Sequence, residues 1–230
     1  FEPGTFENVP AVALGQSLLE SVNTTHATAM DDRGHVVSMT QTLNHAFGSC
    51  VALPGEFPGS GLLLNNTLTL FDPDPRPGYE RANAIAPRKR QLSSMSPTIV
   101  LKNDKPYFAL GTPGGTRIYA TVLQGILNVI DHGMNIQQAV EAPRTWTMMY
   151  GALNVEDGIP PEVTAALEQM GHEIERVRTV AGGMNGVLRD PETGLLHGGA
   201  CWRRDGSVAG WSGGDALPRS ELFPSLWNVK

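Results

Sequence analysis

Hydrophobic and polar residues alternate along two pairs of short segments in this chain. The pairs are residues 26–30 with 35–42, and residues 98–101 with 107–110. A polar turn that ends in Gly34 separates the first pair, and Asn103-Asp104 separates the second. Period-two alternation on both sides of a turn is typical of a β-hairpin. The pattern therefore predicts two hairpins.

Three segments have the signals of helices. After the second hairpin, hydrophobic residues recur three and four positions apart at Ile118, Val122, Ile126, Leu127 and Ile130. This spacing predicts a helix that stops near Gly133. A second, short helix is expected from Asn135 to the residue before Pro143. A third is expected from Pro160 to Gly171, because proline suits the first turn of a helix and glycine the position after its end.

The order of these elements indicates an α+β fold. Strands are expected again over residues 172–180, and a further hairpin around residues 190–194. Hairpins, then helices, then hairpins suggest an antiparallel sheet or sheets with helices on one face. Residues 44–92 contain many prolines and glycines without a regular period, and a long loop of this kind is usually functional or mobile. Residues 1–23 read as an extended tail that leads into a turn of helix.

Composition and charge exclude several classes of protein. Of the 230 residues, 40% are hydrophobic and 17% are charged, which is typical of a globular chain and not of a disordered one. The formal net charge of −6, with one dense basic run at 88–90, argues against a nucleic-acid partner. No apolar run reaches the roughly 18–20 residues that span a bilayer, so we expect a soluble chain with no membrane span, whose compartment (cytoplasmic or periplasmic) stays open.

The sequence shows no pattern of metal ligands. Its six histidines lack the H-x-x-x-H and H-E-x-x-H spacings, and Cys50 and Cys201 are too few and too far apart for a cluster. We therefore expect neither a metal nor a cofactor. Most of the histidines are interpreted as surface residues or hydrogen-bonded core residues.

Gly114-Gly115 is a candidate anion site. The pair follows a predicted strand and precedes a predicted helix, where backbone N–H groups and the helix dipole favour negative charge. Neither dinucleotide nor P-loop spacing is present, so phosphate binding has little support. An oxyanion hole uses the same geometry, and a simple tight turn is the alternative.

Thr24 is a second candidate. A threonine at the start of a strand is usually only a good β-former. It becomes a nucleophile when a base is available, and one such base is its own α-amino group after cleavage of the preceding peptide bond. Neither periodicity nor composition reveals such a cleavage.

Five segments of the sequence resemble the small subunit of γ-glutamyltranspeptidases, in the order of that family. They are Thr24-Thr25-His26 and residues 37–44 (VSMTQTLN), 61–66 (GLLLNN), 89–100 (KRQLSSMSPTIV) and 111–118 (GTPGGTRI). The resemblance runs from Thr24 to about Trp211. It implies a four-layer αββα N-terminal-nucleophile hydrolase sandwich, made from a precursor that cuts itself.

The resemblance also implies roles for individual residues. The cut would lie between Asn23 and Thr24, and Thr24 would supply both the nucleophilic hydroxyl and the α-amine. Thr42 matches the threonine whose hydroxyl supports the nucleophile. Gly114 and Gly115 match the oxyanion-hole pair.

Further matched residues would bind the substrate. Asn44, Ser93 and Ser94 match side chains that hold the polar end of the acyl group, and Thr67 and Leu70 lie in a segment that completes this site. In the family, an acidic residue in that segment pairs with the α-ammonium of a γ-glutamyl group, but here Leu70 stands at its position. A leucine accepts no hydrogen bond, so a buried ammonium would be left unpaired at a cost of about 1–3 kcal/mol or more.

Relatives that lack this acid include cephalosporin (glutaryl) acylases and oxamate amidohydrolases, whose acyl groups carry a carboxylate and no α-amine. The leading hypothesis is therefore an autoprocessing amidohydrolase or acyltransferase that acts on a small-molecule amide. A true γ-glutamyl transferase acting on glutathione is the first alternative, with Asp72 as a candidate acid. A non-catalytic, unprocessed homologue that serves as a binding protein is the second.

The resemblance divides the chain into three parts. Residues 1–23 would be the end of the large-subunit segment, 24–211 the catalytic small-subunit domain, and 212–230 a tail without an assigned role. A large subunit from the same precursor would complete the sandwich and supply an arginine for the substrate carboxylate. That subunit is the expected protein partner.

Overall fold

A computed structural model describes residues 23–53, 61–72, 82–148 and 151–211 of the chain. Both predicted hairpins are present. β1 (Thr24–Met30) pairs antiparallel with β2 (Val36–Thr42), and β3 (Thr98–Lys102) pairs antiparallel with β4 (Lys105–Gly111). The expectations for residues 1–22 and 212–230 lie outside the described residues.

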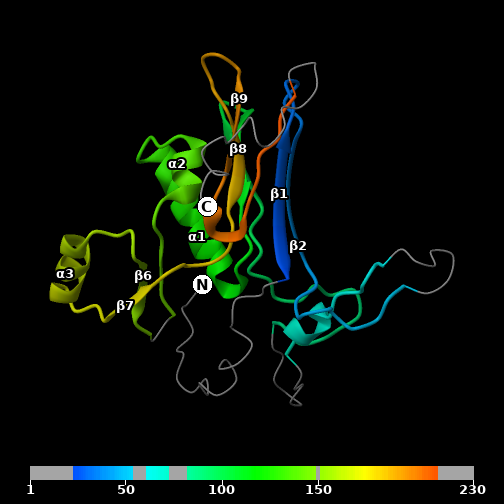
Figure 1. The fold of residues 1–230 in the computed structure, drawn as a ribbon. Helices are drawn as coiled ribbons and strands as arrows, with labels where there is room; N and C mark the ends of the chain where they lie inside the picture. Colours follow the sequence, from blue (N-terminus) through cyan, green and yellow to red (C-terminus); the bar gives the residue numbers. More distant parts are fainter. Residues whose placement is uncertain (1–22, 54–60, 73–81, 149–150, 212–230) are drawn as a thin grey trace, which may run out of the picture.

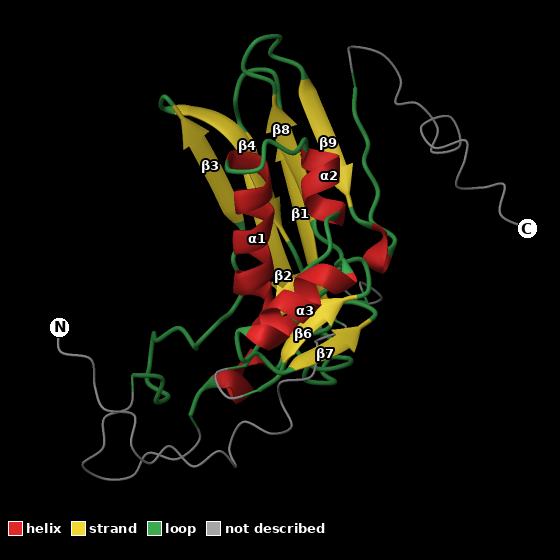
Figure 2. Cartoon of the chain, turned by 90° about the vertical axis from the view of Figure 1, so that its left-hand side faces the viewer, coloured by secondary structure: helices red, strands yellow, loops and turns green. Residues whose placement is uncertain are grey.

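A four-stranded antiparallel sheet forms the centre of the chain. Its order is β3-β4-β8-β9, where β8 (Asn185–Arg189) and β9 (Leu196–Ala200) form the hairpin predicted around residues 190–194. The helices α1 (Ile118–Ile130) and α2 (Ile136–Glu141) cover one face of this sheet, as Figures 1 and 2 show. Both helices lie where the sequence predicts them.

The hydrophobic core lies between this sheet and its two helices. It consists of Phe108, Leu110, Ile118, Val122, Val129, Ile136, Ala139, Val140, Met184 and Cys201. The helix α1 contributes Ile118, Val122 and Val129 to this core, and Ile126 packs against it. Leu127 and Ile130, the last two residues of the predicted apolar stripe, are 39% and 54% exposed, so the predicted stripe matches the buried face only in part. Asn135 caps α2 by accepting a hydrogen bond from the Gln138 amide, which fixes where that helix begins.

The β1–β2 hairpin packs on the opposite face of the central sheet (Figure 1). The side chain of Asn185, on β8, contacts β1 twice: its amide donates to the His26 carbonyl oxygen at 2.7 Å and its oxygen accepts from Thr28 Oγ1 at 3.1 Å. The described residues therefore form three layers: helices, a sheet and a second sheet. The outer face of the hairpin is exposed, and it includes the paired residues Ala27 with Met39 and Ala29 with Val37.

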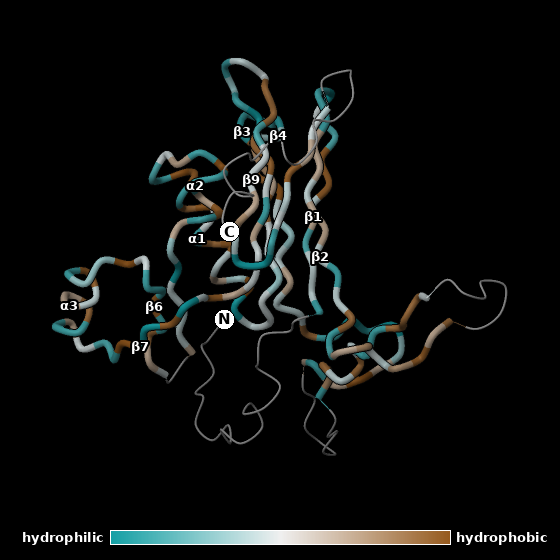
Figure 3. Tube along the Cα trace, viewed as in Figure 1, coloured by the Kyte–Doolittle hydropathy of each residue, from teal (hydrophilic) through white to brown (hydrophobic). Residues whose placement is uncertain are grey.

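A smaller sheet lies beside the main one. β5 (Thr145–Trp146) pairs antiparallel with β6 (Leu153–Glu156), which pairs parallel with β7 (Ile174–Val177). The strand expected over residues 172–180 is thus confined to β7. The third predicted helix is α3 (Pro161–Gln169), in which hydrophilic and hydrophobic residues are interleaved (Figure 3). Among the helices of the described residues, none has both the length and the hydrophobicity to cross a membrane.

Candidate functional site

The candidate nucleophile Thr24 is the first residue of β1, directly opposite Thr42 at the end of β2. The two Oγ1 atoms lie 2.9 Å apart, and either can be the donor. Thr42 Oγ1 also accepts a hydrogen bond from the Asn44 backbone amide at 2.8 Å. Thr24 is only 7% exposed. We call Thr24, Thr42 and Asn44 the hydroxyl cluster.

Asn44 connects this cluster to a short 3₁₀ turn, η2 (Thr67–Leu70). Asn44 has a φ of 73°, a left-handed conformation that asparagine adopts more readily than most residues. Its side-chain amide donates to Thr69 Oγ1 at 3.0 Å. Thr69 is a site residue that was not predicted, and its only signal in the sequence is its place in the segment that the resemblance assigns to substrate binding.

Thr67 and Leu70 lie in the same turn as Thr69. The Thr67 hydroxyl donates to Asn65 Oδ1 at 2.6 Å. Leu70 is half-buried at the end of the turn, and its carbonyl oxygen accepts from Asn83 Nδ2 at 2.7 Å. The structure therefore brings this turn to the hydroxyl cluster through Thr69.

The candidate oxyanion pair follows β4 and leads into the 3₁₀ turn η3 (Gly115–Arg117) and then α1. Gly114 and Gly115 have φ values of 146° and 58°, which side chains rarely adopt. A Cβ atom on Gly114 would also lie 2.7 Å from the Ala181 Cβ atom. Among the loop and turn hydrogen bonds of the described residues, neither glycine amide donates to a backbone oxygen.

The serine segment reaches this glycine turn. Ser94 Oγ donates to the Gly115 carbonyl oxygen at 2.6 Å, so the structure brings these two candidates together. Ser93 is exposed, and its hydroxyl accepts from the Met95 amide at 3.2 Å. Ser94 therefore fixes the turn, while the Ser93 side chain faces solvent.

Packing between β1 and β4 sets where Thr24 lies relative to the glycine turn. The Ser38 hydroxyl, whose residue pairs with Thr28 of β1, contacts the Leu110 carbonyl oxygen at 3.4 Å. One step further along β4, a Cβ atom on Gly111 would lie 2.3 Å from the ring of His26. β1 thus runs back along β4. Thr24 lies beyond Gly111, at the end of the sheet from which the glycine turn departs.

His26 is a buried, neutral residue next to this site. It is 6% exposed, and its Nδ1 lies 2.8 Å from Thr40 Oγ1. Burial lowers the pKa of His26 from 6.5 to about 4, because a charged imidazolium loses its hydration there. Within the described residues, its buried Nε2 has no hydrogen-bond partner. His26 is therefore an uncharged spacer between the two sheets at neutral pH.

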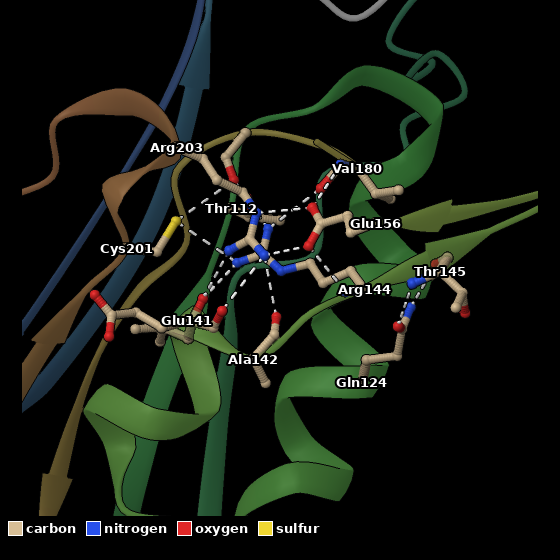
Figure 4. A network of polar contacts seen from close by, with 12 residues as sticks. Thr112, Gln124, Glu141, Ala142, Arg144, Thr145, Glu156, Val180, Cys201 and Arg203 are labelled. Carbon is tan, nitrogen blue, oxygen red and sulfur yellow. Dashed lines mark hydrogen bonds and ion pairs between the residues drawn. The ribbon is translucent and has the colours of Figure 1, made fainter. Parts of the chain in front are cut away.

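A buried group of charged residues lies behind the glycine turn, and sequence reasoning missed it (Figure 4). We call Arg144, Glu156 and Arg203 the ionic network. The Glu156 carboxylate accepts from the Arg144 backbone amide at 2.9 Å, from the Val180 amide at 2.6 Å and from the Arg203 guanidinium. Burial lowers the pKa of the Arg144 guanidinium. Nothing in the spacing of the three residues along the chain marks them as a group.

These contacts define what the site can do chemically. Its parts are a buried hydroxyl supported by a second hydroxyl, and a glycine turn at a helix start whose two amides donate to no backbone oxygen in the loops and turns of the described residues. Such amides can stabilise a developing negative charge. In the described part of the chain, no three His, Cys, Asp or Glu side chains form a group that could hold a metal ion.

Comparisons with known proteins agree on one family. A family model described as Gamma-glutamyltranspeptidase matches residues 6–211. The chain is 47% identical to the Acylase ACY 1 proenzyme of Pseudomonas sp. (strain SE83) over 208 residues, which cover 90% of this chain and 36% of that protein. It is 41% identical to the Glutathione hydrolase proenzyme of Bacillus subtilis (strain 168) over 187 residues, which cover 81% of this chain and 30% of that protein.

The solved structures give the same result. A cephalosporin acylase from Bacillus halodurans superposes with a TM-score of 0.72 at 32% identity, covering 87% of this chain and 37% of that one. The chain spans about a third of the length of the two proenzymes it matches, at 36% and 30%. The similarity therefore concerns one part of a longer protein in these relatives.

Proposed function

Because the chain belongs to the γ-glutamyltranspeptidase family, we propose that it is the small-subunit part of an autoprocessing amidohydrolase or acyltransferase. Its fold is that of the N-terminal-nucleophile hydrolases, of which the described residues supply three layers. The observation that carries the proposal is the 2.9 Å contact between Thr24 Oγ1 and Thr42 Oγ1 at the end of the sheet where the glycine turn departs. In this proposal, residues 24–211 form the catalytic domain.

The proposed reaction begins with cleavage of the Asn23–Thr24 peptide bond. The new α-amine of Thr24 then accepts the proton of its own hydroxyl while Oγ1 attacks the carbonyl carbon of the substrate amide. The amides of Gly114 and Gly115 hold the negative charge that develops on the carbonyl oxygen. The leaving amine takes the proton, and an ester on Thr24 remains. Water or an acceptor amine then removes the acyl group and restores the hydroxyl.

The proposed substrate is the amide of a short acyl group that carries a carboxylate. Asn44 and Ser93 supply hydrogen-bonding groups for its polar end, and Ser94 joins them when its hydroxyl leaves the Gly115 carbonyl oxygen, to which it donates in this structure. Leu70 supplies none, which favours acyl groups without an α-ammonium. Identity to an acylase proenzyme (47%) slightly exceeds identity to a glutathione hydrolase proenzyme (41%), in the same direction. A γ-glutamyl substrate is the second candidate, because the half-buried Asp72 lies only two positions from Leu70.

The proposed partner is the remaining, larger part of the same precursor. Both proenzymes named above are longer than this chain, and a four-layer sandwich needs one more helical layer than the described residues provide. The exposed outer face of β1–β2, with Val37 at 57% and Met39 at 50% exposure, is the surface that this layer would cover.

Substitution of Thr24 tests the function directly. In the complete protein, Thr24→Ala should abolish both self-cleavage and amide hydrolysis, because both steps lose their nucleophile. Intact mass would then show no subunit that begins at residue 24. Thr25→Ala is the matched control, since the exposed Thr25 is the next residue of the same strand and should leave both activities in place.

Two outcomes would contradict the proposal. A Thr24→Ala protein that still separates into two subunits would remove Thr24 as the nucleophile of cleavage. An unmodified protein that stays uncut and hydrolyses neither γ-glutamyl, glutaryl nor oxamyl amides would support the non-catalytic alternative.

A further inference from the structure

The peptide bond that carries the Gly114 amide is held from the side opposite to that amide. We infer that Thr112 is a positioning residue for the proposed reaction: its hydroxyl, together with the Gly182 amide, fixes the Pro113–Gly114 peptide so that the Gly114 N–H points toward the acyl group on Thr24. This inference rests on the proposed oxyanion role of Gly114. It adds the means by which that amide is oriented.

Peptide geometry supplies the first step. In a trans peptide, the C=O and the N–H point in opposite directions, so holding the carbonyl also aims the amide. The Pro113 carbonyl oxygen accepts from the Gly182 amide at 2.9 Å and lies 2.8 Å from the Thr112 hydroxyl. Two donors thus hold this oxygen on the Gly182 side. The Gly114 amide must then point away from Gly182.

The following peptide is held in the same manner. The Gly114 carbonyl oxygen accepts from the Arg117 amide at 3.2 Å, and this bond aims the Gly115 N–H away from the Arg117 amide. Ser94 Oγ holds the Gly115 carbonyl oxygen at 2.6 Å. The two peptides that carry the Gly114 and Gly115 N–H groups therefore both have their carbonyl oxygens held by donors elsewhere in the chain.

Thr112 is the centre of this arrangement. It is fully buried, and its hydroxyl also lies 3.1 Å from the Gly182 carbonyl oxygen. This one side chain therefore contacts both the Pro113 carbonyl group and the Gly182 carbonyl group. A flipped Pro113–Gly114 peptide would leave the Gly182 amide without its buried acceptor, and the Thr112 hydroxyl would keep only the longer contact with the Gly182 carbonyl oxygen. Unmade hydrogen bonds of buried groups are costly, so the flip is disfavoured.

The ionic network holds the other side of the Gly182 segment. Glu156 accepts from the Val180 amide at 2.6 Å (Figure 4), and Arg144 Nη1 donates to the Gly182 carbonyl oxygen at 3.0 Å. Ala181, between these residues, has a left-handed φ of 62° and packs against Gly114. The network thus fixes the segment that in turn fixes the Pro113 carbonyl group.

Paired substitutions of Thr112 test the inference in the complete protein. Thr112→Val keeps the shape and removes the hydroxyl, whereas Thr112→Ser keeps the hydroxyl. We expect Thr112→Val to lower kcat for amide hydrolysis by about 10- to 100-fold, with little change in KM. The upper value corresponds to the complete loss of one oxyanion donor. Thr112→Ser should retain most of the kcat of the unmodified protein. Thr164→Val, which removes the hydroxyl of a buried threonine on α3, is the control and should leave kcat unchanged.

Each outcome has a defined meaning. A folded Thr112→Val protein with unchanged kcat, a loss that Thr112→Ser shares, or an equal loss in Thr164→Val would overturn the inference. If the valine variant does not fold, Thr112→Ala takes its place, because it removes the hydroxyl without crowding the site. The inference is also overturned if kcat falls in the Thr112→Val protein while a crystal structure of that variant shows the Pro113 carbonyl group in its original direction.

Failure of this inference differs from failure of the proposed function. If Thr24→Ala is inactive but Thr112→Val is fully active, the nucleophile stands and the positioning role falls. If Thr24→Ala remains active, the proposed function itself falls, whatever the Thr112 variants show.

Discussion

The partly buried hydroxyl cluster and the buried ionic network hold the chain in different ways. The hydroxyl cluster consists of neutral groups, and a single 2.9 Å contact joins its two threonine side chains. In the ionic network, one carboxylate accepts from two backbone amides and a guanidinium. A neutral hydrogen bond contributes about 0.5–1.5 kcal/mol, whereas breaking a buried ion pair by removing one partner costs about 3–5 kcal/mol.

This difference separates two tasks. Hydroxyl groups can rotate and exchange donor and acceptor roles, which a nucleophile must do when it gives up its proton. The charged groups are locked by several bonds each, and they hold the segment behind the glycine turn. The rigid contacts thus lie behind the site, and the adjustable ones lie at the candidate nucleophile.

The largest expected effect is on the ionic network. Glu156→Gln keeps the shape of the side chain but leaves the Arg203 guanidinium without its buried counter-charge. It also replaces one acceptor oxygen with an N–H₂ group, which would face the N–H donors that the carboxylate binds. We expect the free energy of unfolding to fall by about 3–5 kcal/mol, measured by urea denaturation of the complete protein. Glu168→Gln, at an exposed position on α3, should change it by less than about 0.5 kcal/mol. A loss at Glu156 as small as that of the control would contradict the contrast between the two groups.

A smaller, pH-dependent effect is expected from His26. Its pKa is about 4 in the folded chain and 6.5 when exposed, so the unfolded chain binds this proton more readily as the pH falls below 6.5. Stability should therefore decline between pH 6.5 and 4, by up to about 3 kcal/mol, with no further decline from this residue below pH 4. Unfolding free energies measured across this range should show the decline, and His26→Gln should remove this part of it.

The exposed His132 provides the control for this measurement. His132→Gln should keep the pH dependence of the unmodified protein, because it leaves the buried imidazole in place. If His26→Gln and the unmodified protein lose stability in parallel between pH 6.5 and 4, the burial of His26 does not cause the decline.

Sequence patterns predicted the elements that repeat locally and missed those that depend on distant contacts. The alternation along β1 and β2 and the helical period of α1 are local, so these strands and this helix were predicted and are confirmed. The parallel pairing of β6 with β7 was missed, because both strands have four residues and α3 separates them.

The candidate site divides in the same way. The roles of Thr24 and of the glycine pair came from a family resemblance, and their chemistry stays a prediction. The ionic network could not be predicted, since Glu156 lies 12 positions from Arg144 and 47 from Arg203, and each charge alone reads as a solvated surface group. Only the fold brings the three side chains together.

The smallest expected effect is a change in the preferred acyl donor when Leu70 is substituted. A neutral site edge without a carboxylate should favour glutaryl or oxamyl amides over γ-glutamyl amides. Leu70→Asp would supply an acceptor for an α-ammonium, worth about 1–3 kcal/mol. The ratio of kcat/KM for γ-glutamyl over glutaryl donors should therefore rise about tenfold or more. The change should appear in kcat/KM for the donor, because this ratio reports the steps up to formation of the ester on Thr24 and does not depend on the rate of deacylation.

Leu68, two positions before Leu70, makes the Leu70 measurement specific. It lies in the same 3₁₀ turn and is 69% exposed, so Leu68→Asp adds an equal charge without placing it at the predicted position. A similar shift in both variants would mean that the added negative charge acts at a distance, by attracting cationic donors. If the unmodified protein already uses γ-glutamyl amides as well as glutaryl ones, another acid holds the ammonium. Asp72→Asn should then lower kcat/KM for γ-glutamyl donors alone, because Asp72 is the nearest carboxylate along the chain to that position.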